Sequence, residues 1–115
     1  DGDIQTPSAE LNAEIEAAAA RVNKPLTKAR IHSSDVFYHE DNVDGHREFF
    51  EKHGCVCVEM ESFALFHNAK ILNKRAACLL TISDSPVTHA ETTAQERQTS
   101  FHDMMLVALE TAVAL

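Results

Sequence analysis

Apolar residues recur at helical spacing in four stretches of the chain. Thr6, Pro7 and Ser8 precede the first stretch, where Thr6 or Ser8 can cap a helix and Pro7 suits the first turn. Apolar side chains then recur every three or four positions until Asn23 and Pro25 end the pattern. The sequence therefore predicts a first helix that runs from this cap to about Asn23.

Three further helices are predicted by the same spacing. One begins at Asp41 or Asp44 and ends at Gly54, and the next covers 62–73. The last runs from Thr93 to about 115, and its Thr93-Ala94-Gln95-Glu96 opening is a capping box. We expect one apolar stripe of this last helix to face the core, made of Phe101, Met104, Met105, Ala108, Leu109, Ala112 and Val113.

Strand-like segments alternate with these helices. They cover 29–34, which is short and polar, then 55–60 and 76–82, which are mostly apolar and typical of strands covered on both faces. The order helix, strand, helix, strand, helix, strand, helix predicts an α/β fold with parallel strands and helices on both faces. A sheet of three strands would leave its edges exposed, so we expect this chain to be part of a larger sheet.

Composition narrows the possible partners. The chain has 115 residues, 44% of them hydrophobic, which fits one globular domain or part of one and excludes a disordered chain. With 10 Lys and Arg against 18 Asp and Glu, a net charge of −8 argues against nucleic acid and anionic membranes as partners. No apolar run is long enough to span a bilayer. The chain opens with Asp1 and no leader pattern, so we expect it to begin inside a longer gene product.

The three cysteines predict free thiols in a reducing compartment, which indicates the cytoplasm. Cys55 and Cys57 lie in an apolar run, and the simpler interpretation is two small buried residues on one face of a strand. A metal site would need more ligands at suitable spacing, so no metal is predicted.

Candidate chemistry lies where two predicted strands end. One ends in Glu59 and Glu61, the other in Asp84, and sites of open α/β sheets form at the carboxyl ends of strands. The acidic groups either cap the following helix or enter one cleft together. Arg97 lies 13 residues after Asp84, where it either approaches that carboxylate or stays a solvated side chain of the first helical turn. Spacing alone leaves both pairs of interpretations open.

Three sequence blocks, taken in order, carry a resemblance to a known family. Val58-Glu59-Met60-Glu61-Ser62, then Thr81-Ile82-Ser83-Asp84, then 92–105 resemble the bacterial-type, hexameric purine nucleoside phosphorylases, with matching gaps between the blocks. Upstream, 33–38 is similar to the loop of the base pocket in that family. The resemblance covers essentially the whole chain and the C-terminal half of the family's length.

This resemblance implies a fold and a reaction. Residues 1–115 would form a single partial domain, the C-terminal half of a three-layer α/β/α nucleoside phosphorylase fold with a mixed, largely parallel central sheet. The family cleaves the N-glycosidic bond of purine (deoxy)ribonucleosides with inorganic phosphate, giving the free base and (deoxy)ribose 1-phosphate. No cofactor is implied beyond phosphate as co-substrate. A missing N-terminal half or companion chain would hold the phosphate, in a homohexamer built as a trimer of dimers that serves purine salvage.

The resemblance also assigns roles to residues. Asp84 would be the general acid that protonates N7 of the departing purine, assisted by Arg97. Glu61 and Met60 would hold the sugar. The full set of substrate-binding residues that the resemblance implies is Phe37, which stacks on the base, Val58 and Ser83, which line its pocket, Glu59, which borders the site, Met60 and Glu61.

Two alternatives stay open. A related purine nucleosidase hydrolyses the same bond and shares the Met-Glu and Ser-Asp pairs, although the block 92–97 favours the phosphorylase. The other alternative is a non-catalytic binding or assembly module with this fold.

Overall fold

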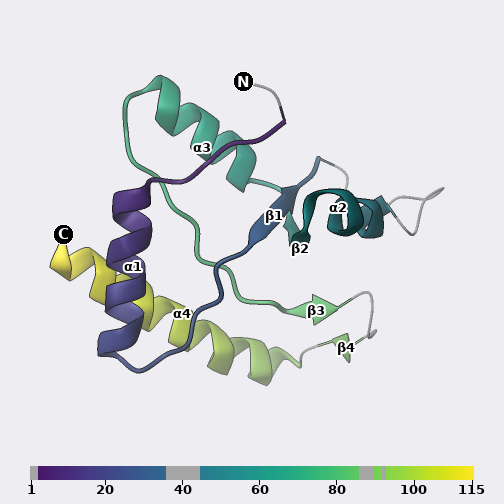
Figure 1. The fold of residues 1–115 in the computed structure, drawn as a ribbon. Helices are drawn as coiled ribbons and strands as arrows, with labels where there is room; N and C mark the ends of the chain where they lie inside the picture. The colour runs from purple at the N-terminus through teal and green to yellow at the C-terminus, as the bar shows by residue number, and fades with distance from the viewer. Residues whose placement is uncertain (1–2, 36–44, 86–89, 92) are drawn as a thin grey trace. The chain divides into compact units, whose positions relative to one another are not determined.

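A computed structural model of the chain describes residues 3–35, 45–85, 90–91 and 93–115 (Figure 1). Contacts along the chain divide it into two compact units, each described by itself below. The first unit contains 1–7 and 27–76, and the second contains 8–26 and 77–115.

The first unit is built on two parallel strands. Strand β1 (Arg30–Ser33) pairs with β2 (Cys55–Glu59), and helix α2 (Gly45–His53) lies between them along the chain. The register skips Val56, so that Ser33 lies opposite Glu59 at the carboxyl end of both strands. Gly54 adopts φ +69° and donates its N–H to the Phe50 carbonyl oxygen at 2.9 Å, which ends α2 and turns the chain into β2.

Helix α3 (Ser62–Ile71) follows β2 after two residues. Asn73 ends it in the left-handed conformation, φ 55°. The Lys74 N–H donates to the Ala69 carbonyl at 2.8 Å, and the Asn73 N–H donates to that of Lys70 at 3.2 Å. This is the Schellman pattern, which satisfies carbonyls that the helix leaves without partners.

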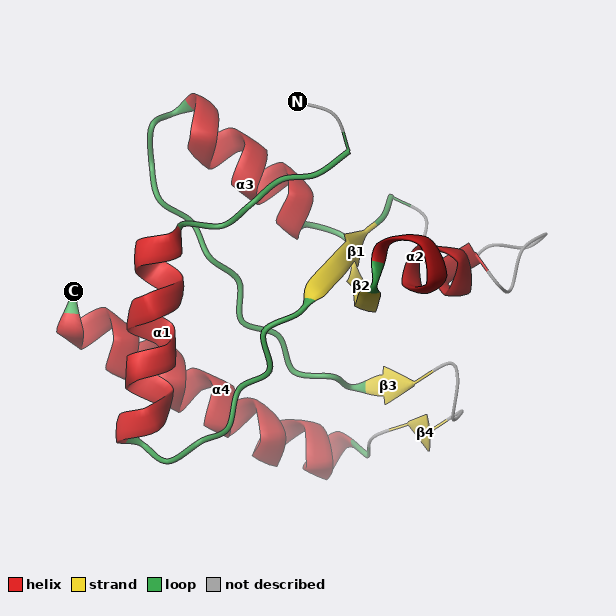
Figure 2. Ribbon diagram, in the orientation of Figure 1, coloured by secondary structure: helices red, strands yellow, loops and turns green. Residues whose placement is uncertain are grey.

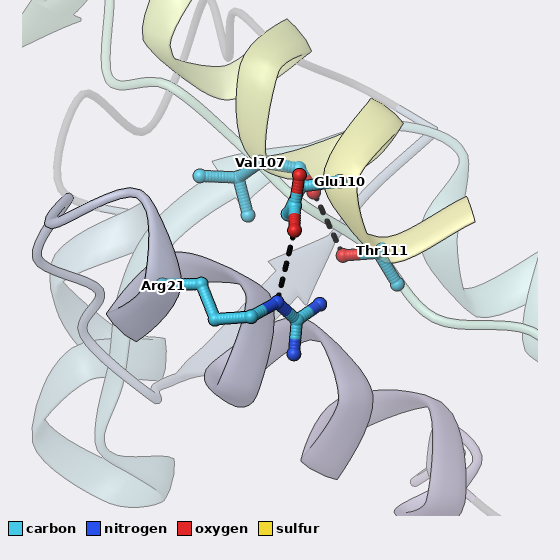
Figure 3. Close-up of polar contacts among 4 residues, drawn as sticks. All are labelled: Arg21, Val107, Glu110 and Thr111. Atoms are coloured by element: carbon cyan, nitrogen blue, oxygen red, sulfur yellow. Dashed lines mark hydrogen bonds and ion pairs between the residues drawn. The ribbon is translucent and has the colours of Figure 1, made fainter. Parts of the chain in front are cut away.

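Two helices pack together in the second unit, α1 (Ala9–Arg21) and α4 (Ala94–Ala114). Ala18 and Val107 are the most buried side chains, 0% and 2% exposed, because alanines on α1 let the two helices approach closely. Figure 3 shows Arg21 Nε of α1 reaching Glu110 Oε1 of α4 at 2.9 Å. It also shows the Thr111 hydroxyl donating to the Val107 carbonyl oxygen one turn earlier, at 2.7 Å.

The ends of α1 follow the sequence pattern with one difference. Ser8 is the cap, and its hydroxyl accepts the Leu11 N–H at 3.2 Å. Pro7 therefore precedes the cap and does not lie in the first turn. Asn23, φ 57°, ends the helix with the same Schellman pattern as α3, since the Lys24 N–H donates to the Ala19 carbonyl at 2.9 Å.

The prediction of a strand over 76–82 is wrong. The described backbone forms no strand there, and the segment is drawn as loop in Figure 2. Instead, β3 (Asp84–Ser85) pairs antiparallel with β4 (Ala90–Glu91), with Asp84 opposite Glu91. An apolar run shows that a segment suits burial, but a strand also needs a neighbour for its backbone, which composition does not reveal.

Two predicted buried faces are also only partly formed. On α4 the buried side chains among the described ones are Val107 and Thr111, which are not in the expected stripe. Phe101 and Met104 of that stripe are half-buried, and its other five residues, Met105, Ala108, Leu109, Ala112 and Val113, are exposed. Val56 of β2 is 59% exposed, so this strand is not covered on both faces.

Candidate functional site

The carboxyl ends of β1 and β2 lead directly into α3. Ser33 and Glu59 are paired there, and the Ser34 N–H extends the pairing by donating to the Glu59 carbonyl oxygen at 2.9 Å. Along the chain, Met60 and Glu61 are the two residues between the end of β2 and the first residue of α3. Any group that fixes this short turn therefore fixes the direction of both side chains.

Glu59 is the group that fixes it. One carboxylate oxygen accepts the Glu61 N–H at 2.7 Å and the Ser62 N–H at 2.8 Å. The other accepts the hydroxyl of Ser62. Glu61 stands at the cap position of α3 but makes no side-chain cap bond. The expected cap at Glu61 or Ser62 is thus replaced by Glu59, whose side chain accepts the first N–H groups of the helix.

The environment of Glu59 keeps its carboxyl group ionised. Burial acts to raise its pKa, but the hydroxyl of Ser62, the N–H groups of Glu61 and Ser62 and the hydroxyl of Ser33 together hold the pKa below its ordinary value. The positive end of the α3 dipole favours the same ionised form. At neutral pH the site therefore carries a fixed negative charge.

Ser33 connects the other strand to the same turn. Its hydroxyl oxygen accepts the Phe63 N–H at 3.2 Å while its proton is directed to Glu59. Ser62 is 5% exposed, so its hydroxyl is held within this network. The ends of both strands and the first turn of α3 are thus joined by Ser33, Glu59 and Ser62, which we call the Glu59 network.

Met60 and Glu61, the predicted sugar-binding residues, are exposed on the turn that the Glu59 network holds. The Met60 N–H donates to Glu61 Oε2 at 3.3 Å, which is long for a hydrogen bond. Val58, predicted to line the base pocket, is half-buried within β2. The turn therefore offers a carboxylate and a flexible apolar side chain to solvent next to a fixed anion.

The remaining predicted residues belong to the second unit or lie outside the described residues. Ser83 is half-buried just before β3, Asp84 begins β3, and Arg97 lies in the first turn of α4. The structure describes the backbone of Asp84 and Arg97, so the approach of their side chains stays a prediction. A cleft shared by Asp84 with Glu59 and Glu61 also stays a prediction. Phe37 lies outside the described residues.

The thiols in β2 have no features of a reactive or metal-binding site. Burial raises the pKa of Cys55, and burial together with Glu59 and Cys55 raises that of Cys57, so neither thiol is activated. Across 3–35, 45–85, 90–91 and 93–115, no group of three or more His, Cys, Asp and Glu side chains is placed to hold a metal ion. In the same ranges no helix has the length and apolarity needed to cross a bilayer.

Comparison with known proteins assigns the chain to a family. A family model described as the phosphorylase superfamily matches 3–115. The chain belongs to the phosphorylase superfamily. The predicted α/β class is confirmed by this membership and by the parallel strands with their helices.

Relatives within the phosphorylase superfamily are named purine nucleoside phosphorylase DeoD-type. The Bacillus velezensis protein is 42% identical over 93 residues, 81% of this chain and 39% of its own length. The Bacillus subtilis protein is 44% identical over 92 residues, covering 80% and 38%. That of Shewanella baltica is 40% identical over 105 residues, covering 91% and 43%. The chain thus spans about two fifths of the length of these relatives.

Sequence reasoning named Glu59 as a candidate site residue but missed the two hydroxyls that hold it. Ser62 entered only as the start of the predicted helix 62–73 and the last residue of the block 58–62, and Ser33 only as part of the predicted strand 29–34 and of the loop 33–38. The order of these residues is not that of a capping box, in which the Ser comes first and the Glu follows three residues later, so it gave no signal of the contact. The pairing of Ser33 with Glu59 depends on strand register, which the sequence does not show.

Proposed function

We propose that the chain is the part of a purine nucleoside phosphorylase that binds the base and the sugar and protonates the departing purine. The observation that carries this proposal is the exposed Met60–Glu61 turn held by the Glu59 network. It lies in a chain that is 40% identical over 105 residues to a protein named purine nucleoside phosphorylase.

Glu61 would bind the hydroxyl groups of the sugar, because a carboxylate accepts hydrogen bonds and donates none. Met60 would contact the apolar face of the sugar with a side chain that adapts its shape. Glu59 would border the same site. Phe37 would stack on the base, in a pocket lined by Val58 and Ser83.

In the proposed reaction, a phosphate oxygen forms a bond to C1′ of the sugar as the C1′–N9 bond breaks. The bonding electron pair goes to the purine, which would leave poorly as an anion. Asp84 would transfer a proton to N7, so that the base leaves neutral and the Asp84 carboxylate remains. Arg97 would favour this transfer by stabilising the carboxylate that forms. The sugar gains positive charge meanwhile, and the carboxylates of Glu59 and Glu61 suit that charge.

The remaining partners follow from the same proposal. The chain has 3 glycines and no Gly-rich loop, so inorganic phosphate would be bound by the N-terminal half of the fold or by a companion chain. We propose no other cofactor. The protein would act in purine salvage in the cytoplasm as a homohexamer, a trimer of dimers. Its net charge of −8 argues against nucleic acid or a membrane as a partner.

Base release from adenosine and inosine, measured with and without phosphate, tests the reaction in the whole protein. We expect release that depends on phosphate and yields a sugar phosphate. Release that is independent of phosphate would instead identify a nucleosidase. Nucleoside binding with no release under either condition would identify a binding module.

The role of Asp84 can be tested by the Asp84→Asn substitution. Loss of a general acid typically slows a reaction by about 100- to 10,000-fold, and we expect kcat to fall within that range. Asp103→Asn is the matched control, because Asp103 lies on the surface of α4 and pairs with Lys24 at 3.3 Å. The control should keep the parent's kcat, and normal turnover by the Asp84 variant would show that this assignment is wrong.

A further inference from the structure

The hydroxyl of Ser62 has a position that helix formation does not require. A serine in the first turn of an exposed helix normally points to water, but Ser62 is 5% exposed and donates to Glu59. The backbone N–H of the same residue donates to the other oxygen of that carboxylate at 2.8 Å. Ser62 therefore contacts both oxygens of Glu59 and restricts the rotation of the carboxyl group.

The restriction is transmitted to the turn. With the carboxylate held by Ser62, its second oxygen is directed at the Glu61 N–H at 2.7 Å, which fixes the backbone at the residue that carries the exposed carboxylate. Ser33 supports the arrangement from the neighbouring strand, accepting the Phe63 N–H at 3.2 Å and donating to Glu59. Ser62 is buried and both serines donate to Glu59, so we expect each to act on the turn through that carboxylate.

We propose that Ser62, supported by Ser33, is a positioning residue of the nucleoside site, which holds the Glu59 carboxylate so that the turn presents Met60 and Glu61 to the sugar. This inference rests on the proposed function. Loss of the Ser62 hydroxyl would loosen the turn but leave Glu59 ionised at neutral pH, because the backbone N–H groups and Ser33 still hold its pKa low, so we expect binding of the sugar to change more than the chemical step.

Removing the hydroxyl should change binding and pH dependence together. Ser62→Ala should raise KM for adenosine by about three- to tenfold with little change in kcat, the size expected when one hydrogen bond to a charged group is lost. Loss of this donor also raises the pKa of Glu59, so the acidic limb of kcat/KM should move to higher pH. A purely structural role would lower stability without moving that limb.

The experiment compares the parent with Ser62→Ala, Ser62→Thr and Ser8→Ala in the whole protein. Ser62→Thr keeps the hydroxyl and should restore KM and the pH profile. Ser8→Ala removes a serine hydroxyl from the start of another helix, α1, where it accepts the Leu11 N–H. This control should lower stability and leave KM and the acidic limb unchanged. Should Ser62→Ala fail to fold, Ser33→Ala replaces it, with the same direction expected.

The outcomes separate this inference from the proposed function. If the parent turns over adenosine and both Ser62→Ala and Ser33→Ala keep its KM and pH profile, the positioning role alone is overturned. A parent with no phosphate-dependent release overturns the proposed function and the nucleoside role of Ser62 with it. Titration of the Glu59 carboxyl carbon by NMR then still decides whether Ser62 holds that group, since an unchanged pKa in Ser62→Ala would contradict it.

Discussion

At the scale of single residues, Glu59 links folding to pH. Its pKa in the folded protein lies below the ordinary value of 4.5, so the folded state favours the ionised carboxyl more than the unfolded state does. Such a group stabilises the fold fully above its unfolded pKa, and the stabilisation is lost as the pH falls through the folded pKa. The contribution therefore belongs to neutral pH and disappears in acid.

Glu59→Gln tests this linkage. At pH 7 we expect the free energy of unfolding to fall by about 1–2 kcal/mol, the value of a charged hydrogen-bond acceptor reduced for partial exposure. The difference from the parent should shrink once the pH drops below 4.5. Urea titrations between neutral and acidic pH would measure it, and a difference independent of pH would contradict the account.

Glu48→Gln provides the contrast for that measurement. Hydrogen bonding and charge from Lys52, at 2.6 Å, also lower the pKa of Glu48, but this pair lies on the fully exposed surface of α2. Salt screens exposed pairs strongly. Glu48→Gln should therefore lower the free energy of unfolding only slightly, and this effect should vanish in concentrated salt. The effect of Glu59→Gln should persist in salt.

At the scale of elements, two helices end at an asparagine in the left-handed conformation. Asn tolerates this conformation better than other residues with a Cβ, and Gly tolerates it without penalty. We expect Asn73→Ala to lower the free energy of unfolding by about 1 kcal/mol and Asn73→Gly to preserve or raise it. Asn68→Ala, within exposed α3, should have the opposite sign because alanine favours helix interiors. Equal effects of both Ala variants would contradict the role of φ 55° at Asn73.

The packing of α1 on α4 gives a second prediction at this scale. Val107→Ala removes two methyl groups from a side chain that is 2% exposed, and we expect a loss of about 1–3 kcal/mol. Val113→Ala makes the same change on α4 where the side chain is 78% exposed, and should change stability by less than about 0.5 kcal/mol. Thermal unfolding of both variants checks the pair, and similar losses would place Val113 in the core.

Elements were predictable from sequence where local chemistry determines them. Ser8 and Asn23 delimit α1, and the apolar run 55–59 became β2, because caps and strand propensity act over a few residues. The prediction for 76–82 was wrong because a strand needs a partner that composition does not reveal, and β3 with β4 was missed because strands of two residues carry no apolar pattern. In the site, the sequence predicted that Glu59 lies at the end of a strand. Its hydrogen bonds with Ser33 and Ser62 were not predictable, because they depend on the strand register and on the conformation of the turn before α3.

At the scale of the whole molecule, exposed apolar side chains exceed buried ones. Among the described residues fifteen large apolar side chains are exposed, including Leu109 and Val113 on α4 and Leu65 and Ile71 on α3. Single exposed apolar side chains are ordinary in folded proteins, but fifteen is a high number beside the four buried hydrophobic residues among the described ones, Ala18, Ala19, Cys55 and Val107. The chain spans about two fifths of the length of its relatives, and we expect the rest of such a fold to cover part of this apolar surface.

We therefore expect the 115-residue chain on its own to bind a dye that fluoresces on apolar surfaces. Adding a polypeptide with the remaining part of the fold should suppress that fluorescence, if it covers the same side chains. Dye binding in the isolated chain no stronger than in an ordinary folded enzyme would contradict the expectation.

The Glu59 network also bears on where the phosphate of the proposed reaction would bind. The first turn of a helix often serves as a receptor for phosphate, because its amides point outward with partial positive charge. In α3 these amides already have acceptors within the protein. The N–H groups of Glu61 and Ser62 donate to the Glu59 carboxylate, and that of Phe63 donates to the Ser33 hydroxyl oxygen. The negative charge of Glu59 would repel a phosphate dianion at the N-terminus of α3. We therefore expect the phosphate site of the proposed reaction to be formed by other parts of the protein.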